Sequence, residues 1–118
     1  MSKRSIARYL LSMGVSPQYK GYRYLVAALS ATIANAQLLN QITTVLYPRV
    51  AQEFQTTPAN VDRCIRTAIE NVWADGNREI LDMLFGKHQT GRPTNARFMA
   101  ILTETLCLAG ALGEEEAQ

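Results

Sequence analysis

Apolar residues recur at steps of three and four along most of the chain, which is the spacing of one face of a helix. The stripe is clearest in the middle of the sequence, at Val61, Ile65, Ala68, Ile69 and Val72. No convincing run alternates apolar and polar residues as a half-buried strand does. The pattern therefore predicts an all-α fold, a single domain of about six helices that contains a helix-turn-helix.

Residues that cap or break helices set the expected limits of these elements. Ser16, Thr57, Asn77 and Thr94 are expected N-caps, and prolines follow the first two of them directly. The expected helices span about 5–13, 17–35, 43–54, 58–75, 77–86 and 94–108, with 38–41 as a connector. Pro48 falls inside the third of these segments, so it either kinks that helix or marks its true start.

Several positions are expected to be buried or closely packed. Gly21 lies within the second helix, which indicates close packing or a loosened first turn there. Cys64 and Cys107 are expected to be buried thiols, and Trp73 to anchor the core. The stripe of the last helix is expected at Phe98, Ile101, Leu102, Thr105 and Leu108.

Composition narrows the class of protein. The chain has 118 residues, of which 47% are hydrophobic and 19% are charged, which fits one domain with its own core. No apolar run is long enough to cross a membrane, and two cysteines are too few for a disulfide scaffold, so a cytoplasmic location is expected.

The charge is distributed unevenly along the chain. Residues 1–52 carry six basic side chains and no acidic one, a net charge of +6, whereas residues 53–118 carry six basic and ten acidic ones, a net charge of −4. A half of the chain in which every charged side chain is basic favours a polyanionic partner, although a solvated basic face gives the same pattern.

The helix expected at 58–75 has a second, polar face opposite its apolar stripe. That face carries Asn60, Arg63, Arg66, Thr67 and Glu70. Polar side chains concentrated in the first turns of a helix that follows a short turn are typical of a recognition helix in the DNA major groove. From the pattern alone, an ordinary solvated face remains the alternative.

Several strings resemble one family closely. They are 20–25 (KGYRYL), 42–51 (ITTVLYPRVA), 61–70 (VDRCIRTAIE), 76–77 (GN), 84–86 (LFG) and 92–98 (RPTNARF). Over residues 6–108 the chain is similar to the C-terminal DNA-binding effector domain of the master response regulator of sporulation initiation. The resemblance implies a six-helix transcription factor domain that binds double-stranded DNA, often as tandem copies on short boxes similar to TGTCGAA.

The resemblance also assigns roles to individual residues. It implies base reading by Arg63 and its neighbours Asn60 and Asp62. Asn60 replaces an arginine of the family, and this change either favours an adenine edge or loses a charged contact. Contacts with the DNA backbone are implied for Thr57, Arg66, Thr67, Lys87, His88 and Arg92. A surface for the sigma subunit of RNA polymerase is implied at Gly76, Arg78, Glu79 and Phe85, with a core position as the alternative for Phe85.

The domain is expected to span 1–109, followed by an acidic flexible tail at 110–118. In the family a receiver domain precedes the effector, so the chain is expected to be either an excised domain or a stand-alone relative. It is expected to be a monomer in solution or a dimer on tandem DNA sites.

Catalysis, a metal site and a cofactor are not expected. His88 is the only histidine, and no companion residues form a catalytic or metal-binding motif with it. The alternative function is a helical protein-interaction module that contacts the sigma subunit and has lost specific DNA binding.

Overall fold

The computed structural model describes the backbone of residues 1–117 and the side chains of residues 1–110. Within this part of the chain the fold is all-α, as predicted, and no strand is present. The six α-helices are α1 (Lys3–Met13), α2 (Lys20–Ala34), α3 (Tyr47–Glu53), α4 (Pro58–Asp75), α5 (Arg78–Phe85) and α6 (Asn95–Ala117).

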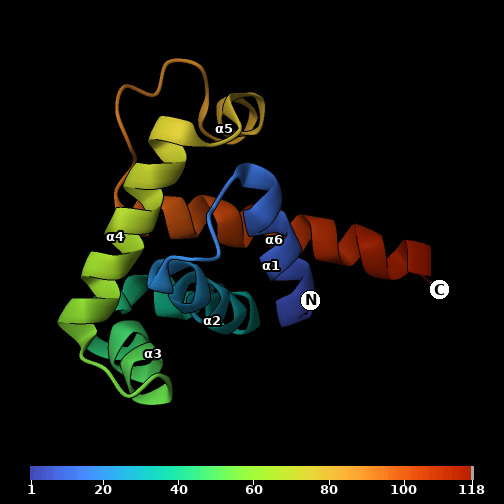
Figure 1. The fold of residues 1–118 in the computed structure, drawn as a ribbon. Coiled ribbons are helices and arrows are strands. Elements are labelled where there is room, and N and C mark those ends of the chain that lie inside the picture. The colour runs from blue at the N-terminus through green and yellow to red at the C-terminus, as the bar shows by residue number, and fades with distance from the viewer. Residues whose placement is uncertain (118) are drawn as a thin grey trace.

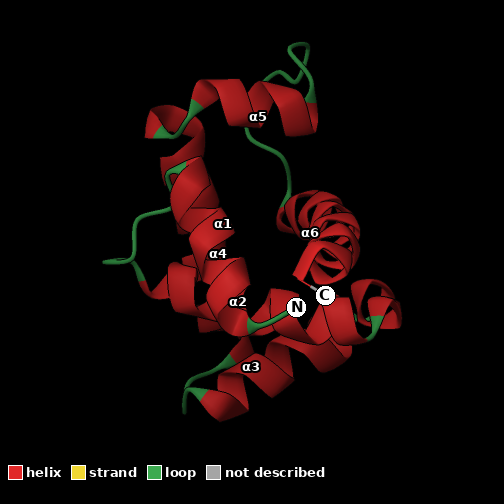
Figure 2. Ribbon diagram, turned by 90° about the vertical axis from the view of Figure 1, so that its right-hand side faces the viewer, coloured by secondary structure: helices red, strands yellow, loops and turns green. Residues whose placement is uncertain are grey.

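Helix α4 forms one edge of the molecule. It runs along one side of the fold, with α3 near its start and α5 near its end (Figure 1). Helix α6 crosses behind α4, and the view turned by 90° looks along the α6 axis and separates α6 from the α1, α2 and α4 group (Figure 2). No helix within residues 1–117 combines the length and the apolar character needed to cross a bilayer.

The limits of α4 confirm the prediction made from its capping residues. The Thr57 side chain accepts a hydrogen bond of 3.1 Å from the backbone N–H of Asn60, Pro58 is the first helical residue, and Gly76 follows the last. The whole predicted stripe of α4 is buried, at Val61, Ile65, Ala68, Ile69 and Val72. The opposite face is thereby fixed as the one that α4 presents outward.

The start of α2 was predicted wrongly. The helix begins at Lys20 rather than directly after Ser16, and residues 17–19 form a turn. The hydroxyl group of Tyr19 accepts a hydrogen bond of 3.2 Å from the Asn71 side chain of α4. The Tyr19 hydroxyl thus ties the turn before α2 to α4, and no side chain caps the start of α2.

Pro48 marks the start of a regular helix, one of the two outcomes that the sequence left open. Helix α3 begins at Tyr47, and Pro48 is its second residue. A 3₁₀ turn (Ala36–Asn40) and a π-helical turn (Ile42–Leu46) precede it. The ring of proline has no N–H to donate, which costs little in the first turn of a helix.

Gly21 packs directly against α4, as the sequence analysis anticipated. A Cβ atom at this position would overlap the carbonyl oxygen of Cys64 and lie 2.8 Å from the Cβ atom of Ala68. The two helices therefore approach each other closely enough that only glycine fits between them. This contact sets the position of α4 relative to the rest of the core.

The last part of α6 differs from the prediction. Leu108 is 63% exposed, and Cys107 is exposed rather than buried. The buried residues of α6 are Phe98, Met99, Leu102, Thr103 and Leu106. The buried face is therefore turned relative to the predicted stripe, and Leu108 lies on the opposite side of the helix. The side chains of residues 111–118 lie outside the described residues, and the domain limit at 109 with an acidic flexible tail stays a prediction.

Candidate nucleic-acid interface

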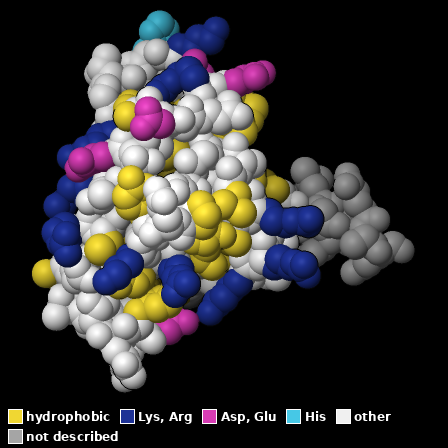
Figure 3. All heavy atoms as spheres, in the orientation of Figure 1, with side chains coloured by type: hydrophobic (Ala, Val, Ile, Leu, Met, Phe, Trp, Pro, Cys, Tyr) yellow, Lys and Arg dark blue, Asp and Glu magenta, His cyan; other side chains and the backbone are white. Residues whose placement is uncertain are grey.

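The outer face of α4 carries the polar residues that the sequence singled out. Arg63, Thr67 and Glu70 are exposed, and Asn60 and Arg66 are half-buried at the borders of this face. Lys and Arg side chains follow the edge of the molecule that α4 forms (Figure 3). The first half of α4 thus presents one exposed polar face, with Arg63 near its middle.

The Asn60 side chain links the turn before α4 to the Arg63 guanidinium group. Its Nδ2 atom donates a hydrogen bond of 2.9 Å to the Thr56 hydroxyl oxygen. Its Oδ1 atom accepts hydrogen bonds from Arg63 Nη2 at 2.5 Å and from Cys64 Sγ at 3.6 Å. Arg63 is therefore exposed, yet held at one nitrogen by a side chain one turn earlier.

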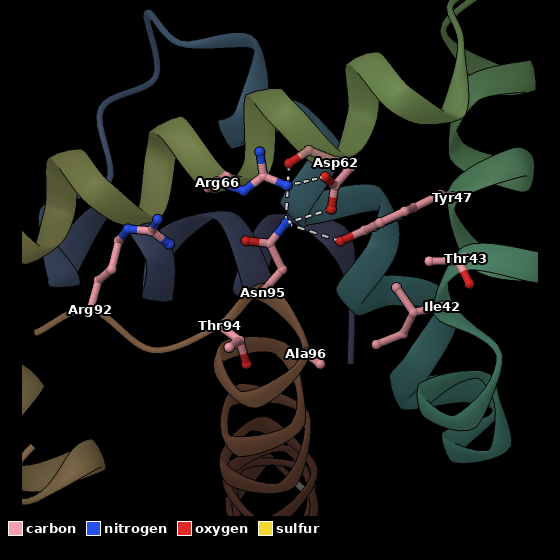
Figure 4. A pocket seen from close by; sticks show the side chains of 9 residues that line it. All are labelled: Ile42, Thr43, Tyr47, Asp62, Arg66, Arg92, Thr94, Asn95 and Ala96. Atoms are coloured by element: carbon pink, nitrogen blue, oxygen red, sulfur yellow. Dashed lines mark hydrogen bonds and ion pairs between the residues drawn. The ribbon is translucent and has the colours of Figure 1, made fainter.

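Asp62 turns its carboxylate away from the outer face. The Nδ2 atom of Asn95, the first residue of α6, lies 3.1 Å from three acceptors: Asp62 Oδ1, the Asp62 carbonyl oxygen and the Tyr47 hydroxyl. Asp62 also forms an ion pair with Arg66 one turn later on α4. Figure 4 shows these side chains converging from α3, α4 and α6.

This cluster joins α4 to two other helices. Asn95 lies 33 positions from Asp62 and 48 from Tyr47 in the sequence, so the periodicity of α4 could not reveal the cluster. Its one signal in the sequence was the string RPTNARF, which the family resemblance used without assigning a role to Asn95. Sequence reasoning therefore missed Asn95 and gave Asp62 only a base-reading role.

The Tyr47 hydroxyl makes stability sensitive to alkaline pH. Burial, together with the Asp62 carboxylate nearby, raises the pKa of Tyr47 to about 12. The folded state thus holds this proton more tightly than the unfolded state does. The stability gained in this way is complete below the ordinary tyrosine pKa of about 10 and is lost as the pH rises from there through 12.

We therefore expect unfolding to become easier between pH 10 and pH 12, by on the order of 2 kcal/mol from this group. Tyr47→Phe removes the titrating hydroxyl and is expected to flatten the slope in that interval. Urea unfolding of both proteins at a series of pH values checks this. The lysines titrate alike in the two proteins, so their contribution cancels in the difference between the two free energies of unfolding. Parallel pH profiles for both proteins would contradict the assignment.

The α6 side of α4 carries a second group of polar residues. Arg92 Nη2 lies 3.6 Å from Glu70 Oε1 and so pairs with the acidic side chain of the outer face of α4, which stays exposed. Thr94 caps α6 by accepting a hydrogen bond of 3.1 Å from the Arg97 backbone N–H. Arg66, Arg92 and Thr94 line a hollow of about 340 Å³ between α4 and the start of α6.

The remaining residues expected at the backbone of DNA lie in different surroundings. Lys87 and His88 are exposed in the loop between α5 and α6. The Thr57 oxygen accepts the capping hydrogen bond, which leaves its hydroxyl proton to donate elsewhere. Thr67 instead donates its proton to the Arg63 carbonyl oxygen at 3.1 Å.

The basic residues of the first 52 positions do not all gather on α4. Lys3, Arg4 and Arg23 border a separate hollow between α1, α2 and the end of α3, where Lys3 lies 3.5 Å from Glu53. Lys20 stands at the start of α2, next to the Gly21 contact with α4. Three of the six basic residues of this half therefore border a hollow that α4 does not line.

The residues expected to contact the sigma subunit divide into exposed and buried ones. Arg78 and Glu79 are exposed, and the Arg78 guanidinium lies 4.9 Å from the centre of the Trp73 ring. Phe85 is only 7% exposed and stacks on Phe98, so the core alternative is correct and Phe85 is not available at the surface.

Gly76 is also part of the packing between helices. A Cβ atom there would lie 2.8 Å from the Met13 carbonyl oxygen and still closer to Val72. The adjacent backbone N–H of Asn77 donates to the same Met13 oxygen at 2.9 Å. Gly76 thus joins the end of α4 to the end of α1, and its backbone leaves little surface for a partner.

A comparison with protein-family models places this arrangement among known proteins. The model described as sporulation initiation factor Spo0A C terminal matches residues 6–106. The match covers most of the chain and every helix that builds the core. The chain belongs to this family, which is a DNA-binding effector domain family of transcription regulators and not an enzyme family.

Proposed function

With membership of the Spo0A C-terminal family as the premise, we propose that this chain recognises a specific DNA duplex with the first turns of α4 in the major groove. The observation that carries the proposal is the exposed Arg63 guanidinium, held by Asn60 on the outer face of a helix at the edge of the fold. A helix with one buried and one exposed face fits the major groove, which is about 12 Å wide.

Arg63 is the residue proposed to read a base. A guanidinium group can donate two parallel hydrogen bonds to O6 and N7 of guanine, and five N–H donors leave enough for this after the bond to Asn60. Asp62 contributes indirectly, since its carboxylate is engaged by Asn95 and Arg66.

The phosphates on the α6 side are proposed to meet Arg66, Arg92 and the loop with Lys87 and His88. Arg66 and Arg92 border the same hollow beside α4, so they can contact one strand while α4 occupies the groove. Thr57 is proposed to donate its hydroxyl proton to a phosphate near the start of α4. Thr67 lies on the same face, but its hydroxyl proton is already donated to the Arg63 carbonyl oxygen and is not free for a phosphate.

Arg92→Ala is expected to weaken binding to all duplexes by a similar factor. A phosphate contact carries no sequence information, and its loss reduces the slope of log K against log salt by about one. Fluorescence anisotropy at several salt concentrations, with a specific and a scrambled duplex, measures both effects. Arg8→Ala on α1 removes the same charge away from α4 and controls for net charge.

A loss confined to the specific duplex would show instead that Arg92 reads sequence. An unchanged slope of log K against log salt would show that Arg92 serves only as the ion-pair partner of Glu70.

A second candidate function uses the α5 surface. Met83 is 73% exposed there and shares a hollow with Arg78, Glu79 and Lys87. An exposed apolar side chain among charged ones suits a protein contact, for which we propose the sigma subunit of RNA polymerase. The chain would then be an interaction module, with or without specific DNA binding.

Retention on heparin and a gel shift with a random duplex pool separate the two functions. DNA binding predicts salt-sensitive retention and a shifted band. If neither is seen while a purified sigma subunit is bound, the interaction module is the function. Selection of bound sequences from the same pool then gives the target, and duplexes with one or two boxes show whether the chain binds as a monomer or as a pair.

A further inference from the structure

We infer that Asn60 is a positioning residue that orients the Arg63 guanidinium and does not itself read a base. The inference rests on the proposed function, since it concerns how the first turn of α4 meets DNA. Of the two alternatives that the sequence left open for Asn60, an adenine contact or a lost charged contact, it replaces the first.

The hydrogen-bonding capacity of Asn60 is already in use. Reading adenine requires the side-chain amide to donate to N7 and its oxygen to accept from the N6 amino group. The oxygen has two lone pairs, and these face the donors Arg63 Nη2 at 2.5 Å and Cys64 Sγ at 3.6 Å. The nitrogen donates one of its two protons to Thr56 at 2.9 Å. No acceptor remains for an adenine amino group.

The amide is also fixed from the side of the turn. Asn60 is half-buried, and its backbone N–H bonds to the Thr57 hydroxyl while its side chain bonds to the Thr56 hydroxyl. Two anchors in the turn thus hold the residue before it reaches Arg63. A side chain held in this way is better suited to support a neighbour than to move toward a base edge.

Arg63 gains from this support. Residues three apart on a helix are neighbours, and the Asn60 oxygen binds one N–H of the guanidinium. A long exposed side chain otherwise loses rotamer freedom when it binds, and a preformed orientation lowers that cost. The sequence Thr56, Asn60, Arg63 is therefore a chain of contacts from the turn to the reading group.

A double-mutant cycle on a duplex selected from a random pool tests the inference. The proteins are the unsubstituted chain, Asn60→Ala, Arg63→Ala and the double variant, each measured against all single base-pair changes of the site. We expect Asn60→Ala to weaken the specific duplex about three- to tenfold and to relax preference at the same base pair as Arg63→Ala. In the Arg63→Ala background the second substitution is expected to change nothing further.

Two further variants keep the test independent of folding defects. Asn60→Asp retains an oxygen for Arg63 but cannot donate to adenine N7, so we expect the base preference to survive even where the new charge lowers affinity. Thr56→Val removes only the hydroxyl that anchors Asn60, and we expect it to reproduce part of the Asn60→Ala effect. Thermal melts followed by circular dichroism report whether each variant is folded.

Loss of preference at a different base pair, persisting in the Arg63→Ala background and in Asn60→Asp, would overturn the inference and assign base reading to Asn60. If the unsubstituted chain binds no duplex at all, the proposed function fails instead, and the inference with it. The first outcome leaves DNA binding intact, so the two failures are distinguishable.

Discussion

Arg63→Ala is expected to cost about 1–3 kcal/mol of discrimination at a single base pair, because a bidentate contact with guanine is lost. The specific duplex should lose roughly 5- to 150-fold in affinity, and a scrambled duplex should lose only the small share due to one positive charge. The reason is structural: Arg63 is exposed on the outer face of α4, and its side chain is already held in place by Asn60.

Competition between the specific duplex and a set of single base-pair variants measures the effect. Arg8→Ala is the matched control, since it removes an exposed arginine on α1 and should affect all duplexes alike. Equal losses on the specific and scrambled duplexes for Arg63→Ala would assign this residue to the phosphates.

Gly21→Ala is expected to destabilise the fold by about 1–3 kcal/mol, the usual cost of overpacking a core. An alanine in an ordinary helix interior would instead stabilise it by up to about 1 kcal/mol. The reversed sign follows from the contact with α4, where the new methyl group would overlap the Cys64 carbonyl oxygen and crowd Ala68. Backbone cannot give way as a flexible side chain does.

The midpoint of urea unfolding, followed by far-ultraviolet circular dichroism, measures the change. Arg23→Ala, an exposed position in the same part of α2, controls for the effect of alanine on the helix itself. Since Cys64 belongs to α4, we also expect weaker DNA binding by Gly21→Ala. Stability equal to that of the unsubstituted chain would show that α2 and α4 can separate at little cost.

The sequence determined α4 so well because every local signal agrees there. Thr57 as a cap, Pro58 as the first residue, the buried stripe and Gly76 all specify the same helix. The buried and exposed faces of a helix follow directly from such a stripe. The outward position of Arg63 could therefore be predicted without any knowledge of the neighbouring helices.

Other parts of the fold depend on contacts between distant segments. The turn before α2 is tied to α4 by the bond between Tyr19 and Asn71, which lie 52 positions apart, and the helix begins at Lys20 rather than directly after the Ser–Pro pair. Leu108 continues the predicted stripe of α6, but the buried face is the neighbouring one that carries Met99, Thr103 and Leu106, so the periodicity alone gave the wrong exposure.

The candidate site also combines features that the local sequence predicts with features that depend on contacts between side chains. The sequence identified which residues of α4 face outward, but it could not show that Asp62 is engaged by Asn95 or that Asn60 is engaged by Arg63. Hydrogen-bond partners of side chains depend on rotamers and on neighbouring helices, neither of which periodicity encodes. For this reason the roles that we propose for Asn60 and Asp62 differ from those that the family resemblance implied, whereas the role proposed for Arg63 is the same.

Replacement of single guanines by 7-deazaguanine in a selected duplex tests most directly whether α4 reads the major groove. This base lacks the N7 acceptor but still pairs normally, so only a contact in the major groove is lost. At one guanine we predict that the substitution weakens binding of the unsubstituted chain about tenfold or more, and that it has no further effect on Arg63→Ala. Unchanged affinity at every guanine, or the same loss with and without Arg63, would contradict recognition of DNA by the exposed face of α4.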